Sequence, residues 1–412
     1  MNQARTDAAT DLAERAARVL PGGSTHMARA YRPAIYVARA QGSRKWLVDG
    51  REMVDYTMGH GALLLGHAHP AVVGAVREQL RRGTHYGAAS PQEVEWAERI
   101  AALVPSARQL RFTASGTEAA MLALRLARVA TRRSRIVKLA DHFNGWSDAV
   151  SVDIDEDGLP HPVPGVPDEV AALTTVVVPE PDVIRAAVAD RSAAALILEP
   201  TGAHYGRTPL DRAVVQAARE ATAQTGTVLI FDEVVSGFRV APGGMQSLLE
   251  VAPDLTLFGK VMAGGLPAGA VGGSPELMGA LVSRVAHPGT FNANPLSASA
   301  GIATLDIVGT GEAQRVAAAY AEQLVAGWGR SLEASGISGR AWSLASIVHV
   351  ELDDQAAQSH LADEMRARGV DLLHTSAFCS AVHTPADLEF TIDVFDASIR
   401  AAEASASAAG VS

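Results

Sequence analysis

The sequence predicts an α/β fold with a mostly parallel sheet in a large domain, and a smaller α+β domain built from both ends of the chain. Between residues 110 and 233, apolar runs without polar alternation are separated by stretches of helical periodicity, as in parallel sheets buried on both faces. After residue 305 the pattern changes to long helices around one strand. The length of 412 residues is sufficient for both domains.

The N-terminal segment of the small domain is predicted over residues 1–65. Apolar residues recur at helical spacing from Leu12 to Leu20 and stop at a Pro-Gly-Gly sequence, which predicts a short amphipathic helix. Residues 35–50 and 53–59 then alternate as strands around the turn signal Asp49-Gly50.

The large domain is predicted over residues 66–304 and the C-terminal part of the small domain over residues 305–412. The expected large-domain strands are residues 110–114, 135–140, 174–179, 194–200 and 227–233, and its expected helices include 118–130 and 211–223. In the C-terminal part we expect helices at 314–332 and 355–368, a strand at 346–352 and a closing helix from about Pro385.

Composition argues against several classes of protein. With 35 basic and 45 acidic residues the formal net charge is −10, which disfavours a nucleic-acid partner. The single cysteine, Cys379, excludes an internal disulfide and fits a reducing compartment. No apolar run approaches the roughly eighteen residues of a membrane helix, and the acidic N-terminal residues do not resemble a secretion signal. We therefore expect a cytoplasmic protein without a membrane partner.

The first candidate for chemistry is Lys260, which lies in an apolar stretch rich in glycine. Lysine is rarely buried, and burial lowers the pKa of an amine so that its neutral form can attack a carbonyl group. Neighbouring glycines leave room for a flat ring close to the backbone. The alternative is a lysine at a strand end whose amine reaches solvent.

Asp232 ends an expected strand, 28 residues before Lys260, which leaves room for one crossover and the next strand. Ligands of α/β sheets bind at the carboxyl ends of parallel strands, and an aspartate there can keep a pyridinium nitrogen protonated. A solvated acidic turn is the alternative for Asp232 alone.

Two further segments fit a ring that carries a phosphate. Ser115-Gly116-Thr117 leads from a strand into a helix, where free N–H groups and the helix dipole attract anions. Phe143 follows a strand end and could stack on a ring. A plain N-cap and a core or rim aromatic are the alternatives.

These four elements in this order resemble the class III aminotransferases of fold type I, which depend on pyridoxal 5'-phosphate (PLP). The likeness covers nearly the whole chain and is greatest to members similar to glutamate-1-semialdehyde 2,1-aminomutase. It includes the segments VLPGGS, ASGTEA, FDEVVSGFR, PDLTLFGKVMAGGLPAGAVGG and GTFNANPLSASAG.

The resemblance implies a role for each matching residue. Lys260 falls on the Schiff-base lysine, Asp232 on the partner of the pyridine nitrogen, and Val234 and Phe143 on the residues at the two ring faces. The phosphate cup corresponds to Ser115, Gly116 and Thr117. His204 replaces an asparagine near the phenolic oxygen of PLP.

Two more matches concern the substrate and a partner subunit. Arg29 matches the arginine that pairs with a substrate carboxylate, which suits the guanidinium fork, although a solvated surface arginine is the alternative. Thr290 matches a residue that reaches the phosphate from the other subunit, so the resemblance implies a homodimer. No metal site is expected, because nothing further clusters with His67 and His69.

The substrate pocket departs from the aminomutase pattern. His60 stands where that pattern has tryptophan, Phe378-Cys379 replaces a Phe-Glu pair, and the lid segment at residues 152–162 carries four acidic residues. Mutual repulsion among these carboxylates predicts a hydrated, open lid.

We therefore expect an aminotransferase that uses Lys260 to move an amino group between a carboxylate-bearing amino acid, such as a β- or aromatic amino acid, and a keto acid. The alternatives are a 2,1-aminomutase or amino-acid epimerase at the same cofactor site, and a non-catalytic binding protein. The last is disfavoured because Lys260, Asp232 and the phosphate cup are all retained.

Overall fold

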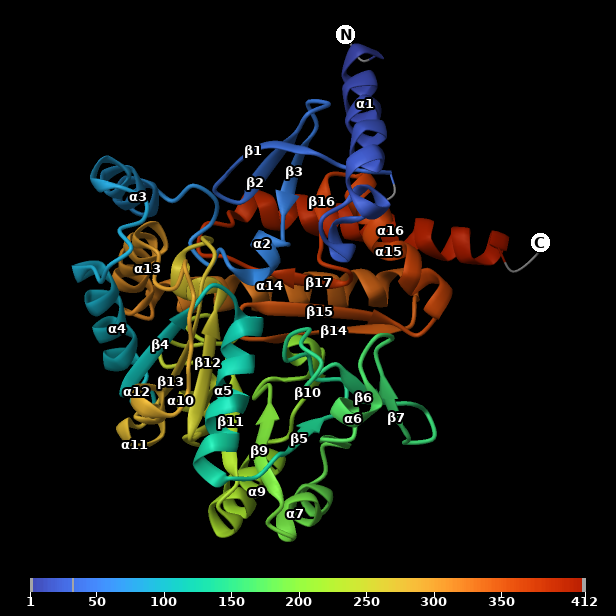
Figure 1. Ribbon diagram of the computed structural model, residues 1–412. Helices are drawn as coiled ribbons and strands as arrows, with labels where there is room; N and C mark the ends of the chain where they lie inside the picture. Colours follow the sequence, from blue (N-terminus) through green and yellow to red (C-terminus); the bar gives the residue numbers. More distant parts are fainter. Residues whose placement is uncertain (1–2, 32, 410–412) are drawn as a thin grey trace.

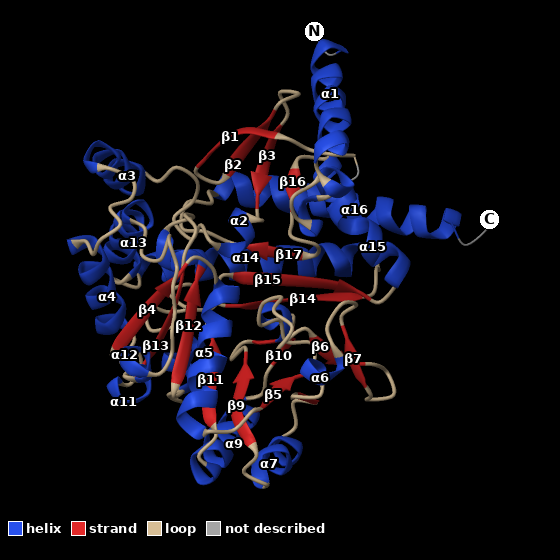
Figure 2. Ribbon diagram, viewed as in Figure 1, coloured by secondary structure: helices blue, strands red, loops and turns tan. Residues whose placement is uncertain are grey.

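The computed structural model describes residues 3–31 and 33–409, and its largest element is a seven-stranded sheet (Figures 1 and 2). The strand order is β4-β13-β12-β11-β9-β5-β8. Their bounds are Gln109–Thr113, Gly269–Gly273, Leu255–Gly259, Val228–Asp232, Ala193–Leu198, Arg135–Leu139 and Thr174–Val177, in that order. Strand β13 runs antiparallel to both neighbours, and the other pairs are parallel. The prediction of a mostly parallel sheet is confirmed.

Strand β13 is an element that the periodicity did not predict. Its sequence, GAVGG, has a low intrinsic strand propensity. The strand forms because its glycines permit close approach: a Cβ on Gly269 would lie 2.2 Å from the Ser115 carbonyl oxygen, and one on Gly272 would lie 2.4 Å from Ala107 Cβ.

Both faces of the sheet are buried, because successive residues of each strand point to opposite sides. Ile230 packs toward helix α5 (Gly116–Thr131). Its neighbours Leu229 and Phe231 pack toward α7 (Pro181–Ala189) and α9 (Arg212–Thr225) on the other face. This two-sided burial explains why the strands lack polar alternation.

The other predicted helices and the C-terminal strand are present with small shifts at their ends, except that the first helix begins at Gln3, well before the predicted Leu12. They are α1 (Gln3–Val19), α14 (Glu312–Ser335), β15 (Ile347–Leu352), α15 (Gln355–Ala367) and α16 (Pro385–Ala409). The remaining larger helices are α3 (Pro70–Arg82), α4 (Pro91–Leu103) and α13 (Pro295–Val308). No helix in the described ranges is long and apolar enough to cross a membrane.

The strand expected over residues 35–50 is divided in two, so this prediction was wrong in detail. Strand β1 (Val37–Gln41) ends at Gly42, whose φ is +59°, and β2 (Arg44–Leu47) returns antiparallel to it. Strand β3 (Glu52–Asp55) follows after the predicted turn. Glycine favours the turn because it adopts a positive φ without steric cost.

The two ends of the chain meet in the small domain. Strand β16 (Val370–Asp371) pairs parallel with β3, so C-terminal and N-terminal segments share one sheet, seen in Figure 1 as red beside blue. A second sheet holds β15 between β14 (Gly339–Leu344) and β17 (Ser376–Phe378). The division at residues 65 and 304 stays a prediction; the second boundary falls inside α13.

Candidate active site

Three titratable side chains lie at the carboxyl ends of three adjacent parallel strands. Asp232 is the last residue of β11, Glu199 follows β9 on one side, and Lys260 follows β12 on the other. Parallel strands that end at one sheet edge bring such side chains together, and this edge is where α/β sheets bind ligands. The structure therefore brings together the two catalytic candidates and adds Glu199.

Lys260 is one of three lysines in the chain and the only one without an ion pair within the described residues. Lys45 is paired with Asp55 and Asp371, and Lys138 Nζ lies 3.4 Å from Asp153 Oδ2. Desolvation lowers the pKa of Lys260, although the nearby carboxylates oppose the shift. A larger fraction of its amine is therefore neutral and nucleophilic.

Asp232 is buried and held by two donors. Its Oδ2 accepts a hydrogen bond from Asn144 Nδ2 at 3.0 Å, and its Oδ1 accepts one from the Val234 N–H at 3.1 Å. Burial raises the pKa of Asp232, and the two donors and Lys260 act in the opposite direction. Asn144 Oδ1 is buried without a partner in the described part of the chain, so this side chain has one unused acceptor beside Asp232.

Glycines allow Val234 to sit closely between two elements. A Cβ on Gly116 would lie 2.9 Å from Val234 Cγ2, and one on Gly259 would lie 3.0 Å from Val234 Cγ1. Both contacts are too short for a side chain, so Val234 forms a tightly packed apolar surface between the start of α5 and the strand that leads to Lys260.

The start of α5 is a capping box. Ser115 Oγ accepts from the Glu118 N–H at 3.2 Å, and Glu118 Oε2 accepts from the Ala114 N–H at 3.0 Å. The N–H groups of Gly116 and Thr117 belong to the first turn, which has no acceptor within the helix. The plain N-cap and the anion site are thus compatible, because different groups serve them.

Phe143 lies beside the carboxylates through its backbone, while its side chain is 65% exposed in the single chain. Its N–H donates to Glu199 Oε1 at 2.8 Å. Asn144 is the next residue, so one short loop after β5 carries both an exposed ring and the amide that holds Asp232. His204 lines a cavity together with these two residues, but its side chain is exposed.

Glu199 is a candidate site residue that the sequence analysis missed. It is 6% exposed and accepts hydrogen bonds from the Phe143 and Tyr205 N–H groups at 2.8 and 3.3 Å. Burial, followed by the charge of Asp232, raises its pKa to about 8. The available signal was its place at the end of an expected strand, the same signal that identified Asp232.

The substrate candidates Arg29 and His60 come from the N-terminal segment. Arg29 lies in a 3-10 turn (Met27–Arg29), and the rings of His26 and His60 are 5.4 Å apart between centroids. Burial lowers the pKa of His60 to about 4, with further contributions from His26, Arg29 and Lys260. The structure thus brings Arg29 and His60 near Lys260, and no carboxylate of the described residues lies within 4 Å of the Arg29 guanidinium.

Arg239 is a second residue that the sequence analysis missed, and it is fully buried. Its Nε and Nη2 donate to the Gly61 carbonyl at 3.1 and 2.9 Å, and its Nη1 donates to the Cys379 carbonyl at 3.0 Å. Burial lowers its pKa to about 10, and its charge lowers that of Lys260. It links the large domain to both ends of the chain near the site.

Two expectations about the substrate pocket were wrong. Cys379 is fully buried in the small-domain core, where its small apolar side chain packs with the other core residues. The acidic lid is not an open loop: β6 (Val152–Ile154) and β7 (Pro160–Pro162) pair as a hairpin. Two of its four carboxylates have local partners: Lys138 contacts Asp153, and the Asp157 and Leu159 N–H groups donate to Asp155 Oδ1.

Thr290 lies apart from these residues in the single chain. It is exposed, and its carbonyl accepts from His85 Nε2 at 2.5 Å. His67 is occupied elsewhere, since its Nε2 lies 2.6 Å from Asp55 Oδ2. The described residues contain no cluster of three or more His, Cys, Asp or Glu that could hold a metal.

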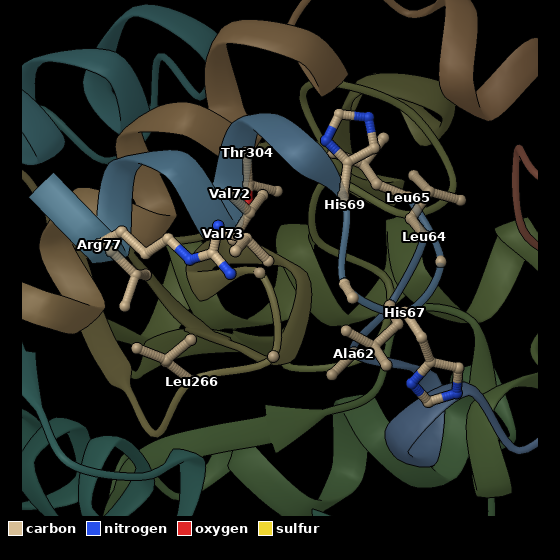
Figure 3. Close-up of a pocket in the computed structure, with 16 residues that line it drawn as sticks. Ala62, Leu64, Leu65, His67, His69, Val72, Val73, Arg77, Leu266 and Thr304 are labelled. Carbon is tan, nitrogen blue, oxygen red and sulfur yellow. The ribbon is translucent and has the colours of Figure 1, made fainter. Parts of the chain in front are cut away.

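Another cavity, of about 290 Å³, lies between α3 and the loop after Lys260 (Figure 3). Its lining is mostly apolar, with Leu64, Val72 and Leu266 among the labelled side chains. It contains none of the site residues and no acidic group, so it does not extend the reacting centre.

Comparison with known proteins identifies the family. The model for class-III aminotransferases matches residues 26–390. The chain belongs to the class-III aminotransferase family. A glutamate-1-semialdehyde 2,1-aminomutase of Methanopyrus kandleri is 38% identical over 413 residues, which cover 94% of this chain and 96% of the relative.

Solved structures agree with this class-III assignment. An omega-transaminase from Sphaerobacter thermophilus has a TM-score of 0.91 and 34% identity, covering 96% of this chain and 98% of that one. A transaminase with PLP bound has a TM-score of 0.92 and 32% identity, covering 97% and 98%. The predictions of fold type I, of an enzyme and of PLP as cofactor are confirmed.

The residues at the sheet edge fit PLP. They offer an amine without an ion pair in the described residues, a buried carboxylate for a ring nitrogen and free helix N–H groups for a phosphate. At Gly116 and Gly259 a Cβ would lie within 3.0 Å of Val234, so both positions favour glycine. The unpartnered acceptor Asn144 Oδ1 lies at the same place.

Proposed function

We propose that this class-III enzyme moves an amino group between a carboxylate-bearing amino acid and a keto acid, with Lys260 as the reacting lysine. The observation that supports this most is the unpaired amine of Lys260 next to Asp232 at the ends of neighbouring strands. PLP, when bound, supplies an aldehyde that condenses with amines and a ring that withdraws electrons from the substrate carbon.

Each site residue then has a defined task. Lys260 holds the cofactor, and once released it carries a proton to and from the substrate carbon, which its lowered pKa favours. Asp232 keeps the ring nitrogen protonated, and Asn144 orients Asp232. The remaining assignments are Val234 and Phe143 at the ring faces, His204 at the phenolic oxygen, and Ser115, Gly116 and Thr117 at the phosphate.

Arg29 and His60 are proposed as the substrate residues. A guanidinium without a carboxylate partner is suited to a substrate carboxylate, which it can bind through two parallel hydrogen bonds. His60 stays neutral at pH 7 because its pKa is about 4, so it adds a polar wall without a charge. A β-amino acid or an aromatic amino acid is a donor of this kind.

A homodimer is part of the proposal. Three aromatic side chains are largely exposed in the single chain: Phe143 and Trp146 beside the site, at 65 and 79%, and Phe291 next to Thr290, at 64%. A second copy would cover such surface, and Thr290, next to Phe291, would reach the phosphate of the other subunit. Thr290→Ala should then weaken PLP retention, whereas a fully active monomer with undiminished retention would refute the assignment.

The deciding experiment asks whether turnover needs an acceptor. The purified holoenzyme is mixed with one amino donor at a time, and the cofactor spectrum is followed. We expect one equivalent of keto product and conversion to the amino form of the cofactor, which only an added keto acid reverses.

The aminomutase is the second candidate, because a relative with that name is 38% identical over nearly the whole chain. An isomerase needs no external acceptor. Steady conversion of glutamate-1-semialdehyde to 5-aminolevulinate without a keto acid would therefore favour the aminomutase and refute the transfer reaction. We also propose a cytoplasmic location, since the single cysteine is a buried free thiol.

A further inference from the structure

A cavity of about 640 Å³ lies beside the candidate active site and has no role in the reaction described above. We name it the Arg207 cavity. It lies between the segment 27–31, the turn α8 (Ala203–Gly206), helix α15 and residues 373–375. Its size is in the range that binds small molecules. The polar side chains that matter here are Tyr31, His204, Arg207, Asp363, Arg366 and His374.

The two arginines of this cavity differ in their charge balance. Arg366 is neutralised, because its Nη1 lies 2.5 Å from Asp363 Oδ1 and its Nε lies 2.9 Å from Asp371 Oδ1. Arg207 has no carboxylate within 4 Å among the described residues, and its Nη1 donates only to Thr375 Oγ1, at 2.5 Å. The cavity therefore carries one positive charge without a protein counter-ion.

Thr375 adds an unused donor to the same wall. Its Oγ1 accepts hydrogen bonds from Arg207 Nη1 and from Gln358 Nε2, the latter at 2.9 Å. A hydroxyl group has two lone pairs, and both are occupied. Its proton is left to donate, and Thr375 is only 5% exposed. A buried donor beside an unpaired guanidinium is a suitable partner for an anion.

The backbone around the cavity is unusual. His204, Tyr205 and His374 have φ values of 50°, 54° and 53°, although none of them is glycine. Such conformations carry a free-energy cost and concentrate at ligand sites. Three of them line this one cavity.

The cavity adjoins the candidate site on two sides. His204 lines both this cavity and the one that contains Phe143 and Asn144. Ala28 and Ala30 line it on either side of Arg29 in the sequence. Two guanidinium groups without protein counter-ions, Arg29 and Arg207, thus come from segments that border the same region.

We propose that the Arg207 cavity binds one carboxylate of a dicarboxylic amino donor or keto acid, with Arg207 as its pairing group and Thr375 as an additional donor. This inference rests on the proposed amino transfer and adds the substrate class: a compound with two carboxylates, of which Arg29 takes the other.

The test uses glutarate, a dicarboxylate that cannot exchange an amino group, and propionate, which has one carboxylate. Calorimetric titration of the holoenzyme should show glutarate binding that Arg207→Gln weakens about ten- to hundredfold, as for a lost charge-assisted hydrogen bond. The affinity for propionate should change by less than about twofold in the same Arg207→Gln variant. The matched control is Arg212→Gln, which removes an exposed arginine paired with Glu250 and should change neither affinity.

A second pair of variants covers the case in which Arg207→Gln does not fold. Ala362 lines the cavity from α15, so Ala362→Glu places a competing carboxylate there and should also abolish glutarate binding. Ala356→Glu adds the same charge at an exposed position of that helix, outside the cavity lining. This control variant should still bind glutarate.

Kinetics then separates a substrate site from a site for a free carboxylate. Glutarate should compete with 2-oxoglutarate, and Arg207→Gln should raise the KM for 2-oxoglutarate about ten- to hundredfold while that for pyruvate stays within about twofold. Absent glutarate binding, equal losses for mono- and dicarboxylates, or binding without competition would overturn the proposal. If no donor and acceptor pair reacts while binding still depends on Arg207, the proposed function fails and the dicarboxylate site stands.

Discussion

Lysine is rare in this chain, and its three lysines occupy different electrostatic environments. The charge of Lys45 is retained, because burial lowers its pKa less than Asp55 and Asp371 raise it. Lys138 donates to the Val152 carbonyl at 3.0 Å and contacts Asp153. Lys260 has no ion-pair partner in the part of the chain that the structure describes. Burial lowers its pKa and so increases the fraction of neutral amine, which is the form that reacts with an aldehyde.

Lys260→Ala should therefore remove the visible absorption of lysine-bound PLP and reduce turnover by several orders of magnitude. Borohydride reduction of the wild-type holoenzyme followed by peptide mapping should find the cofactor on the peptide that contains Lys260. In the variant no peptide should be labelled. Stoichiometric labelling of Lys45 or Lys138 would show that the assignment is wrong.

Glu199 makes stability depend on pH with a definite sign. Its folded pKa of about 8 lies above the ordinary value of 4.5, so the folded state binds more protons than the unfolded state between these values. The contribution of Glu199 to the free energy of unfolding should then be greatest below about pH 4.5 and should decrease as the pH rises to 8. One proton limits the slope to about 1.4 kcal/mol per pH unit.

Glu199→Gln should flatten this decrease, because the amide does not titrate and its oxygen can still accept from the Phe143 and Tyr205 N–H groups. Urea unfolding of the apoenzyme at pH 6, 7 and 8 measures the slope. Glu351→Gln, at an ion pair with the exposed Arg340, serves as a control. An unchanged slope in Glu199→Gln would mean that Glu199 is ionised throughout this range.

At the scale of elements, the capping residues at the start of α5 both stabilise the helix and belong to the proposed phosphate site. Ser115 Oγ accepts from the Glu118 N–H and the Glu118 carboxylate accepts from the Ala114 N–H, which leaves the N–H groups of Gly116 and Thr117 free for an anion. Ser115→Ala should lower the free energy of unfolding by about 1 kcal/mol. It should also weaken PLP retention, because the same turn is the proposed phosphate cup.

Denaturant unfolding with and without PLP separates these two effects. The apoenzyme reports the loss of the cap, and the extra stabilisation by PLP reports the phosphate site. Ser274→Ala is a useful comparison, since Ser274 caps a short helix away from the site by accepting from the Leu277 N–H. Loss of stability without any change in PLP retention would remove Ser115 from the phosphate cup.

At the scale of the whole molecule, Arg239 fastens three distant parts of the chain. It comes from the segment after β11, and its guanidinium reaches Gly61, Ser346 and Cys379. These contacts join the large domain to segments from both ends of the chain. They also hold Gly61 next to His60, a proposed substrate residue.

Arg239→Met should leave the carbonyl groups of Gly61 and Cys379 and the Ser346 hydroxyl without this donor. Each buried acceptor that loses its partner costs about 1–3 kcal/mol, so the melting temperature should fall by several degrees. Arg340→Met, which removes an exposed arginine paired with Glu351, is the matched control. Equal melting temperatures for the two variants would contradict the linking role of Arg239.

The sequence alone determined the parallel sheet, the long helices and the two catalytic candidates. Hydrophobic periodicity is a local property of the sequence. Runs such as 194–200 and 227–233 are apolar throughout because both of their faces are buried, so the sequence is sufficient to recognise them as buried strands. Strand ends are local as well. Asp232 could be recognised because a carboxylate directly after a buried run marks the edge of the sheet.

Only the tertiary structure decided how distant segments meet. Strand β13 is held by close packing of glycines, which no periodicity records. The pKa of Glu199 is raised by burial and then by the charge of Asp232 on the neighbouring strand. Cys379 was expected in the pocket but is fully buried in the core of the small domain, where it packs among residues from distant segments. The burial of these residues and their electrostatic partners depend on contacts between residues far apart in the chain, which cannot be predicted from local sequence patterns.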